Sequence, residues 1–153
     1  ITQPNGRLCG CGNHGCMERY ASASGVVLSY QEATGVLCTA DEIASRAHAG
    51  DGAAIAAYAL AGQSLAQTLA HILKVIDVTD IVIGGGMSAA WPLLKPAFDR
   101  QLSEDLIPVL RGKLQINLSH VGDTAGMLGA ALLSSAMLSS AMLSSAMLAT
   151  RPQ

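Results

Sequence analysis

Apolar residues recur at helical spacing through the first half of the chain. Their spacing predicts three successive helices, over residues 18–34, 39–49 and 53–76. The first of these is expected to end near Gly35. Thr39 is the expected N-terminal cap of the second, because Glu42 three residues later completes a capping box.

The third predicted helix has one long apolar face. Its members are Ile55, Ala59, Leu65, Ala66, Leu69, Ile72, Leu73 and Ile76. This spacing fits the helical period well. Gly62 lies in the interior of the same helix, where glycine costs about 1 kcal/mol relative to alanine. That cost is acceptable if another backbone approaches closely at this position.

Shorter apolar runs in the second half of the chain alternate between strands and helices. The expected elements are a buried strand at residues 81–83, a helix at 91–106, a half-buried strand at 114–118 and a final helix beginning at 122–124. Pro92 is compatible with the first turn of its helix, and Asp123 is the expected cap of the last one. This order of elements predicts half of an α/β domain rather than a helical bundle.

The C-terminal segment is repetitive. After Leu133 the sequence Ser-Ser-Ala-Met-Leu occurs three times, ending at Leu148. Five residues advance a helix by about 140° beyond one full turn, so the leucines do not form one stripe. We interpret residues 134–153 as a low-complexity tail made by tandem duplication, separate from a domain at residues 1–133.

Composition narrows the function classes. Half of the residues are apolar but only 3% are aromatic, which favours helices packed closely on a small sheet. A net charge of -2, with no basic patch interleaved with aromatics, argues against a nucleic-acid partner. No apolar run is long and uncharged enough to span a bilayer. The chain starts within a loop rather than at Met and shows no signal peptide, so we expect a fragment or truncated chain of a cytosolic protein.

Cys9, Cys11 and Cys16 lie in one glycine-rich loop with C-x-C-x4-C spacing. Thiolates on so tight a turn can converge on one small cation, and tetrahedral zinc is the best match. A structural zinc site needs a fourth ligand, for which His14 and a histidine upstream of the chain are the candidates. The alternatives are a disulfide plus a free thiol, or small packed residues, although clustered cysteines in a cytosolic chain more often bind metal. Cys38 stands alone and is expected to be a packed residue.

Two further features can be interpreted either structurally or functionally. Glu18 follows the cysteine loop and is either an acid that stabilises a helix N-terminus or a carboxylate aimed at a polar ligand. Gly84, Gly85 and Gly86 follow the first predicted strand and either form a tight turn or let the backbone approach a nucleotide. The glycine run is neither G-x-G-x-x-G nor a P-loop, and it is a weak signal alone.

Taken together, these segments resemble the ROK family of sugar kinases and repressors. The matching stretches, in the family's order and spacing, are CGCGNHGCMERYASASG (9–25), DVTDIVIGGGMS (77–88) and GDTAGMLGAALL (122–133). The resemblance covers nearly all of the chain up to Leu133, and its C-G-C-G-x-x-G-C-x-E signature is highly specific. The SASG run and the GDTAG stretch look most like bacterial glucokinases, with fructokinase, N-acetylmannosamine kinase and N-acetylglucosamine kinase close.

The resemblance implies an α/β fold, the C-terminal lobe of an actin-like (ribonuclease-H-like) sugar kinase with a zinc loop. ATP, Mg²⁺ and the sugar would occupy the cleft between two lobes of a cytoplasmic homodimer. The three cysteines match the family's zinc ligands, whose fourth member is an upstream histidine. Glu18 matches the residue that binds sugar hydroxyls, and the run Gly84–Gly86 matches the adenosine-side motif.

The sequence also departs from the family pattern. The phosphate loop D-x-G-x-T and the catalytic aspartate that follows an asparagine are absent from the printed sequence. In-line phosphoryl transfer needs metal-bound phosphates and an oriented nucleophile, so we expect no turnover by this chain alone. The leading hypothesis is the C-terminal part of an ATP-dependent, glucokinase-type hexokinase. The alternatives are part of a sugar-responsive repressor whose DNA-binding element lies upstream, and a non-catalytic remnant stabilised by zinc.

Overall fold

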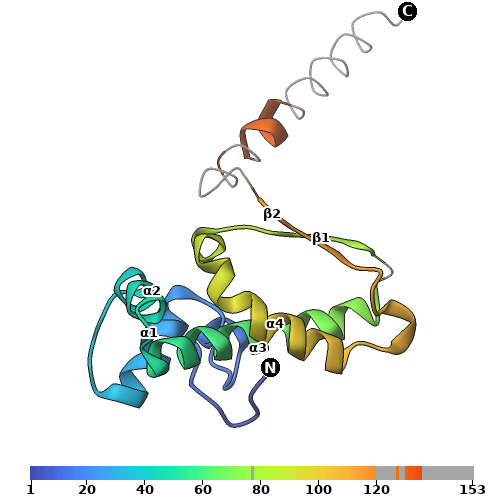
Figure 1. Ribbon diagram of the computed structural model, residues 1–153. Helices are drawn as coiled ribbons and strands as arrows, with labels where there is room; N and C mark the ends of the chain where they lie inside the picture. The colour runs from blue at the N-terminus through green and yellow to red at the C-terminus, as the bar shows by residue number, and fades with distance from the viewer. Residues whose placement is uncertain (77, 120–126, 128–129, 136–153) are drawn as a thin grey trace, which may run out of the picture.

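The computed structural model describes residues 1–76, 78–119, 127 and 130–135. Its helices and strands, in chain order, are α1 Ala23–Thr34, α2 Ala40–His48, α3 Gly52–Leu73, β1 Asp80–Ile83, α4 Trp91–Asp105 and β2 Gln115–Leu118. Three short 3-10 turns are η1 Met17–Arg19, η2 Gly86–Ala90 and η3 Pro108–Leu110. The helices α1 to α4 form one layer, and the two strands lie along one side of it (Figure 1).

The first helix begins at Ala23, so the prediction that it starts at Glu18 is wrong. Ser22 is its cap, and the Ser22 hydroxyl accepts a hydrogen bond of 3.1 Å from the Gly25 amide. Serine at this position satisfies one of the free amides at a helix start. Tyr20 packs so closely on Gly25 that a Cβ at Gly25 would lie 2.7 Å from the Tyr20 carbonyl. The chain therefore turns before α1 instead of continuing as one helix.

Local capping signals determine the other helix ends. The predicted capping box of Thr39 and Glu42 is confirmed at the start of α2. Asp51 caps α3 by accepting hydrogen bonds from the Ala53 and Ala54 amides. The third helix ends at Leu73 rather than at the predicted residue 76, because the following residues form a turn.

The buried face of α3 matches the predicted one only in part: Ala66 and Leu73 are buried, and Leu65 and Leu69 pack against the core. Ile55 and Ile72 are 47% and 44% exposed. The buried positions of α3 are mostly small: Ala54, Ala57, Tyr58, Ala61, Gly62, Ser64, Ala66, Ala70 and Leu73. Small side chains let α4 pack against α3 at short range. The condition under which Gly62 is acceptable is met, since a Cβ there would lie 2.4 Å from the Leu94 carbonyl oxygen.

The two strands form a parallel pair in which Ile81 lies beside Ile116. The side chains that pack against the helical core are Ile81, Ile83, Ile116 and Leu118. Val82 points the other way and is 68% exposed. The prediction of a buried first strand is therefore wrong for the described residues, among which helices cover only one face of the sheet. The half-buried alternation predicted for 114–118 is confirmed.

The predicted final helix falls largely outside the described residues. Asp123, its expected cap, is among the residues that are not described, and residues 130–135 are helical. The repeat from residue 136 onward also lies outside the described part. No helix in the described ranges is long and apolar enough to cross a membrane.

Candidate zinc loop and ligand clefts

The cysteine loop folds back on itself as a short two-stranded turn. Leu8 and His14 form an antiparallel bridge, and the Cys9 amide donates to the Asn13 carbonyl at 2.8 Å. Gly15 has a φ of 72°. A Cβ at Gly15 would lie 1.7 Å from the carbonyl oxygen of Gln3, so only glycine fits there. These constraints bring the cysteines of the loop together.

Cys9, Cys11 and Cys16 form the one group of potential metal ligands found in the part of the chain that the structure describes. Their sulfur atoms all lie within 4.8 Å of one another. The Cys11 and Cys16 sulfurs are 3.5 Å apart. Tetrahedral zinc with bonds of about 2.3 Å places its sulfur ligands about 3.8 Å apart. The donor set and its spacing therefore fit zinc, and neither His14 nor Cys38 belongs to the group.

The pKa values of Cys11 and Cys16 shift in opposite directions. The Asn13 amide donates to the Cys11 sulfur and, with help from Cys16 and Cys9, lowers the pKa of Cys11. The hydrogen bond with Cys11, followed by burial, raises the pKa of Cys16 to about 11. Cys11 is thus the first of these two thiols to ionise, and binding of a cation must displace the proton of Cys16.

Glu18 lies on η1, immediately after the loop. Its carboxylate is exposed and accepts a hydrogen bond from the Cys9 thiol at 3.5 Å. Its main-chain carbonyl accepts a bond of 2.6 Å from the Ser22 hydroxyl. Because Ser22 is the cap of α1, Glu18 lies before that helix rather than in its first turn. The metal-ligand cluster and this carboxylate therefore belong to one local unit.

The run Gly84–Gly86 leaves the carboxyl end of β1 and leads into η2. Gly85 has a φ of 92°, a conformation that favours glycine. A Cβ added at Gly85 would meet no atom within 4 Å, whereas one at Gly84 would lie 3.2 Å from Ser119 Cβ. The backbone at Gly85 is therefore open to close approach by a ligand.

Two clefts adjoin these motifs. The first has a volume of about 280 Å³ and is lined by Met17 and Ala21, which come before and after Glu18 in the chain, and by Gly84 and Met87. Glu18 itself is not one of its lining residues. The second has a volume of about 400 Å³ and lies between the η2 segment and α2. Its lining includes Gly86, Met87, Ala90, Asp41 and His48. Met17 and Gly84 line the same cleft, so the η1 turn and the glycine turn lie near one another despite their separation in sequence.

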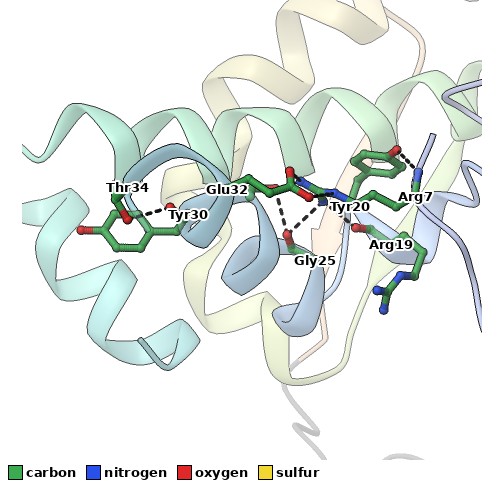
Figure 2. A network of polar contacts seen from close by, with 8 residues as sticks. Arg7, Arg19, Tyr20, Gly25, Tyr30, Glu32 and Thr34 are labelled. Carbon is green, nitrogen blue, oxygen red and sulfur yellow. Dashed lines mark hydrogen bonds and ion pairs between the residues drawn. The ribbon is translucent and has the colours of Figure 1, made fainter. Parts of the chain in front are cut away.

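Two parts of this region are not predicted by the sequence: the α2 wall of the second cleft and the side chain of Arg7. The α2 wall of the second cleft contains Asp41 and His48, which carry no recognisable spacing signal. Arg7 precedes the cysteines and holds the loop on α1, as Figure 2 shows. A single arginine in a loop gives no periodic or motif signal, and its role emerges only from its contacts.

Comparison with known proteins identifies relatives of this chain. The family model described as ROK family matches residues 1–137. An N-acetyl-D-glucosamine kinase of Escherichia coli O1:K1 / APEC is 38% identical over 125 residues, which cover 82% of this chain and 41% of that protein. The chain thus spans about two fifths of the length of the curated relatives that it matches.

Solved structures with the same fold include kinases and a regulator. A ROK family glucokinase from Streptomyces griseus, solved in complex with glucose and AMPPNP, gives a TM-score of 0.73 at 28% identity, covering 86% of this chain and 48% of that one. A ROK family transcriptional regulator, a homologue of the E. coli MLC protein, gives a TM-score of 0.64 at 27% identity. The match covers 77% of this chain and 33% of that one.

Proposed function

The chain belongs to the ROK family, and from this premise we propose that it is part of an ATP-dependent sugar kinase. In this proposal the chain supplies the zinc loop, a sugar-binding carboxylate and the adenosine side of the nucleotide site. The kinases among its relatives support the reaction class. The observation that carries the proposal is the cleft of about 280 Å³ in which Met17, the residue before Glu18, lies opposite the glycine turn at Gly84.

Zinc has a structural role in this proposal. Cys9, Cys11 and Cys16 hold the ion, and a fourth ligand completes its tetrahedral shell. The bound ion would fix the loop and, through it, the adjacent turn that carries Glu18. Metal binding and folding of such loops are coupled, because the ligands converge only in the folded state.

The sugar is bound through its hydroxyl groups in this proposal. The exposed carboxylate of Glu18 accepts hydrogen bonds from them, and bonds to a charged acceptor are stronger than neutral ones. The sugar named for the E. coli relative is N-acetylglucosamine, and the one bound in the Streptomyces structure is glucose. We therefore propose a glucose-type hexose as substrate. A glucokinase and an N-acetylglucosamine kinase are therefore the two candidate activities.

The nucleotide is assigned to the second cleft. Gly84, Gly85 and Gly86 let the backbone approach the adenosine, and the cleft of about 400 Å³ beside Gly86 has room for a base. Mg²⁺ would neutralise charge on the phosphates when bound. An ATP-dependent enzyme whose cysteines are all free thiols in the described ranges suits the reducing cytoplasm. The homodimer implied by the family is also part of the proposal, and sedimentation tests it.

Binding and phosphorylation assays test the proposal. Glucose and N-acetylglucosamine are titrated into the zinc-loaded protein by calorimetry, and ATP-dependent phosphorylation is followed after adding an N-terminal lobe that contains D-x-G-x-T. Saturable binding of one sugar, with the other weaker, supports the proposal and selects the substrate. Absence of binding by both sugars, together with absence of phosphorylation, contradicts it.

A second candidate function is a sugar-responsive regulator. The observation in its favour is the similarity to the solved ROK family transcriptional regulator. A regulator would share the zinc loop and the sugar-binding carboxylate but would not need ATP. Sugar binding that persists while ATP neither binds nor is consumed, even with the other lobe present, favours the regulator over the kinase.

A further inference from the structure

Arg7 connects three separate parts of the molecule. Its own backbone belongs to the cysteine loop, where the Gly15 amide donates to the Arg7 carbonyl at 2.9 Å. Its guanidinium crosses the Tyr20 ring at 4.6 Å and reaches the first turns of α1. Figure 2 shows this side chain lying between Glu32 on α1 and the turn that contains Arg19.

Every N–H of the Arg7 guanidinium has an acceptor. Nε and one terminal nitrogen donate to the two carboxylate oxygens of Glu32, at 3.1 and 2.6 Å. The same terminal nitrogen donates to the Ser29 hydroxyl at 3.0 Å. The other terminal nitrogen donates to the carbonyls of Arg19, at 2.8 Å, and Gly25, at 3.3 Å. A guanidinium has five N–H groups, and this arrangement uses all of them.

The bond to the Arg19 carbonyl bears on the candidate sugar site. Arg19 directly follows Glu18 in η1, and Ser22 holds the carbonyl of Glu18 itself. Both carbonyls beside the functional carboxylate are therefore fixed. The Arg7 side chain is only 13% exposed, whereas that of Glu32 is 59% exposed. The buried end of the Arg7 network thus faces the Glu18 turn, and the ion pair lies at the outer end.

We propose that Arg7 is a positioning residue for Glu18. It holds the η1 turn between the cysteine loop and α1, so that the carboxylate is presented in one orientation to a sugar hydroxyl. This inference rests on the proposed sugar-binding function. Lysine cannot replace Arg7, because three donors on one nitrogen cannot serve acceptors spread around a planar fork.

The test compares Arg7→Lys with two other variants. Glu32→Gln weakens the outer ion pair while leaving the bonds to the Arg19 and Gly25 carbonyls in place. Arg100→Lys makes the same chemical change at an exposed position of α4. Hydrogen exchange of residues 17–21, read by mass spectrometry, reports on the turn, whose amides donate to Cys16 and Met17. Exchange of α2 reports whether the fold is intact, and calorimetry with glucose and N-acetylglucosamine reports on sugar affinity.

We expect Arg7→Lys to speed exchange in residues 17–21 and to weaken sugar binding about tenfold, the effect of losing one charge-assisted hydrogen bond. Exchange in α2 should stay at the wild-type rate, and the other two variants should bind sugar normally. Normal sugar affinity and unchanged exchange of the turn in Arg7→Lys would overturn the proposal.

If Arg7→Lys also speeds hydrogen exchange in α2, the fold itself has been disturbed and a milder variant is needed. Tyr20→Phe removes only the acceptor of the Arg7 amide, a bond of 3.0 Å. Faster exchange of the turn with an intact α2 supports positioning, and loss that spreads equally over both segments overturns it. If the wild type binds neither sugar, the proposed function fails. In that case the hydrogen-exchange rates of residues 17–21 alone test whether Arg7 holds the turn in place.

Discussion

The backbone of Gly62 on α3 lies directly against the carbonyl of Leu94 on α4. A Cβ at Gly62 would be 2.4 Å from that oxygen and 3.2 Å from the Phe98 amide nitrogen. Both neighbours are backbone atoms, which cannot rotate away as a side chain would. The two helices that make the centre of the core are therefore held at a separation that only glycine permits.

Gly62→Ala should destabilise the fold by about 1–3 kcal/mol, the usual cost of overpacking a core. Gly52→Ala is the matched control, because a Cβ at Gly52 meets no atom within 4 Å. The control should be neutral or slightly stabilising, since alanine restricts the unfolded chain. Urea melts of the two variants measure both effects. Equal urea midpoints for the two variants would show that α3 and α4 can move apart without a loss of folding stability.

The sequence predicts a structural feature well when the residues that form it are close together in the chain, and poorly when they are far apart. The capping box of Thr39 and Glu42 is a local motif, and it was predicted to the residue. The buried face of α3 is predicted only in part: Leu73 is buried, but Ile55 is exposed while its neighbour Ala54 is buried. Which face is covered depends on α4, which follows later in the chain, and on a close helix approach that favours alanine and glycine over larger residues.

In the candidate site, too, local features are predicted by the sequence and features that depend on distant residues are not. The spacing of Cys9, Cys11 and Cys16 predicted a metal-ligand cluster, and their sulfurs converge. The start of the next helix was misplaced because the close contact of Tyr20 with Gly25 is not visible in the hydrophobic pattern. Arg7 was not predicted because its partners are distributed over η1 and α1.

Zinc content tests the metal assignment directly. We expect one zinc ion bound per chain in reducing buffer if a fourth ligand or water completes the shell. Cys11→Ser should lose most of the metal, whereas Cys38→Ser should keep it, since Cys38 lies outside the cluster. Elemental analysis of the purified proteins gives the stoichiometry. A zinc content near zero in the wild type, unchanged by Cys11→Ser, would remove the metal from the proposal.

Zinc affinity should rise with pH. The pKa of Cys16 is raised to about 11, so its thiol is protonated near neutral pH and must release a proton when the metal binds. Lower pH makes that release harder and higher pH makes it easier. The apparent affinity should increase about tenfold per pH unit for each proton released, over roughly pH 6 to 8. Competition with a coloured chelator measures it, and a flat profile would contradict thiolate ligation.

The 153-residue chain alone should not phosphorylate glucose or N-acetylglucosamine. It contains no D-x-G-x-T loop and spans about two fifths of the length of its kinase relatives. Phosphoryl transfer depends on groups that orient the phosphates and the nucleophile together. A coupled assay should show ATP-dependent activity only after an N-terminal lobe is supplied. Robust turnover by the isolated chain would mean that one of its own residues acts as the catalytic base.

Glu18→Gln should weaken sugar binding while sparing zinc and the fold. A glutamate that accepts hydrogen bonds from sugar hydroxyls contributes roughly 1.5–3 kcal/mol for each bond to the charged group. The amide keeps one acceptor but loses the charge, so the Kd for the sugar, or its KM in the active protein, should rise about tenfold or more.

Glu104→Gln is the matched control for Glu18→Gln, because it removes the same charge from an exposed glutamate on α4. Since Glu18 lies before the cap of α1, its loss should leave the melting temperature close to that of the wild type. A glutamate that only stabilised a helix N-terminus would instead contribute about 0.3–1 kcal/mol to stability and nothing to sugar affinity. Calorimetry and a thermal melt on the same samples separate these roles. A lowered melting temperature with unchanged sugar affinity would exclude Glu18 from the sugar site, and Arg7 would then position a structural turn rather than a binding group.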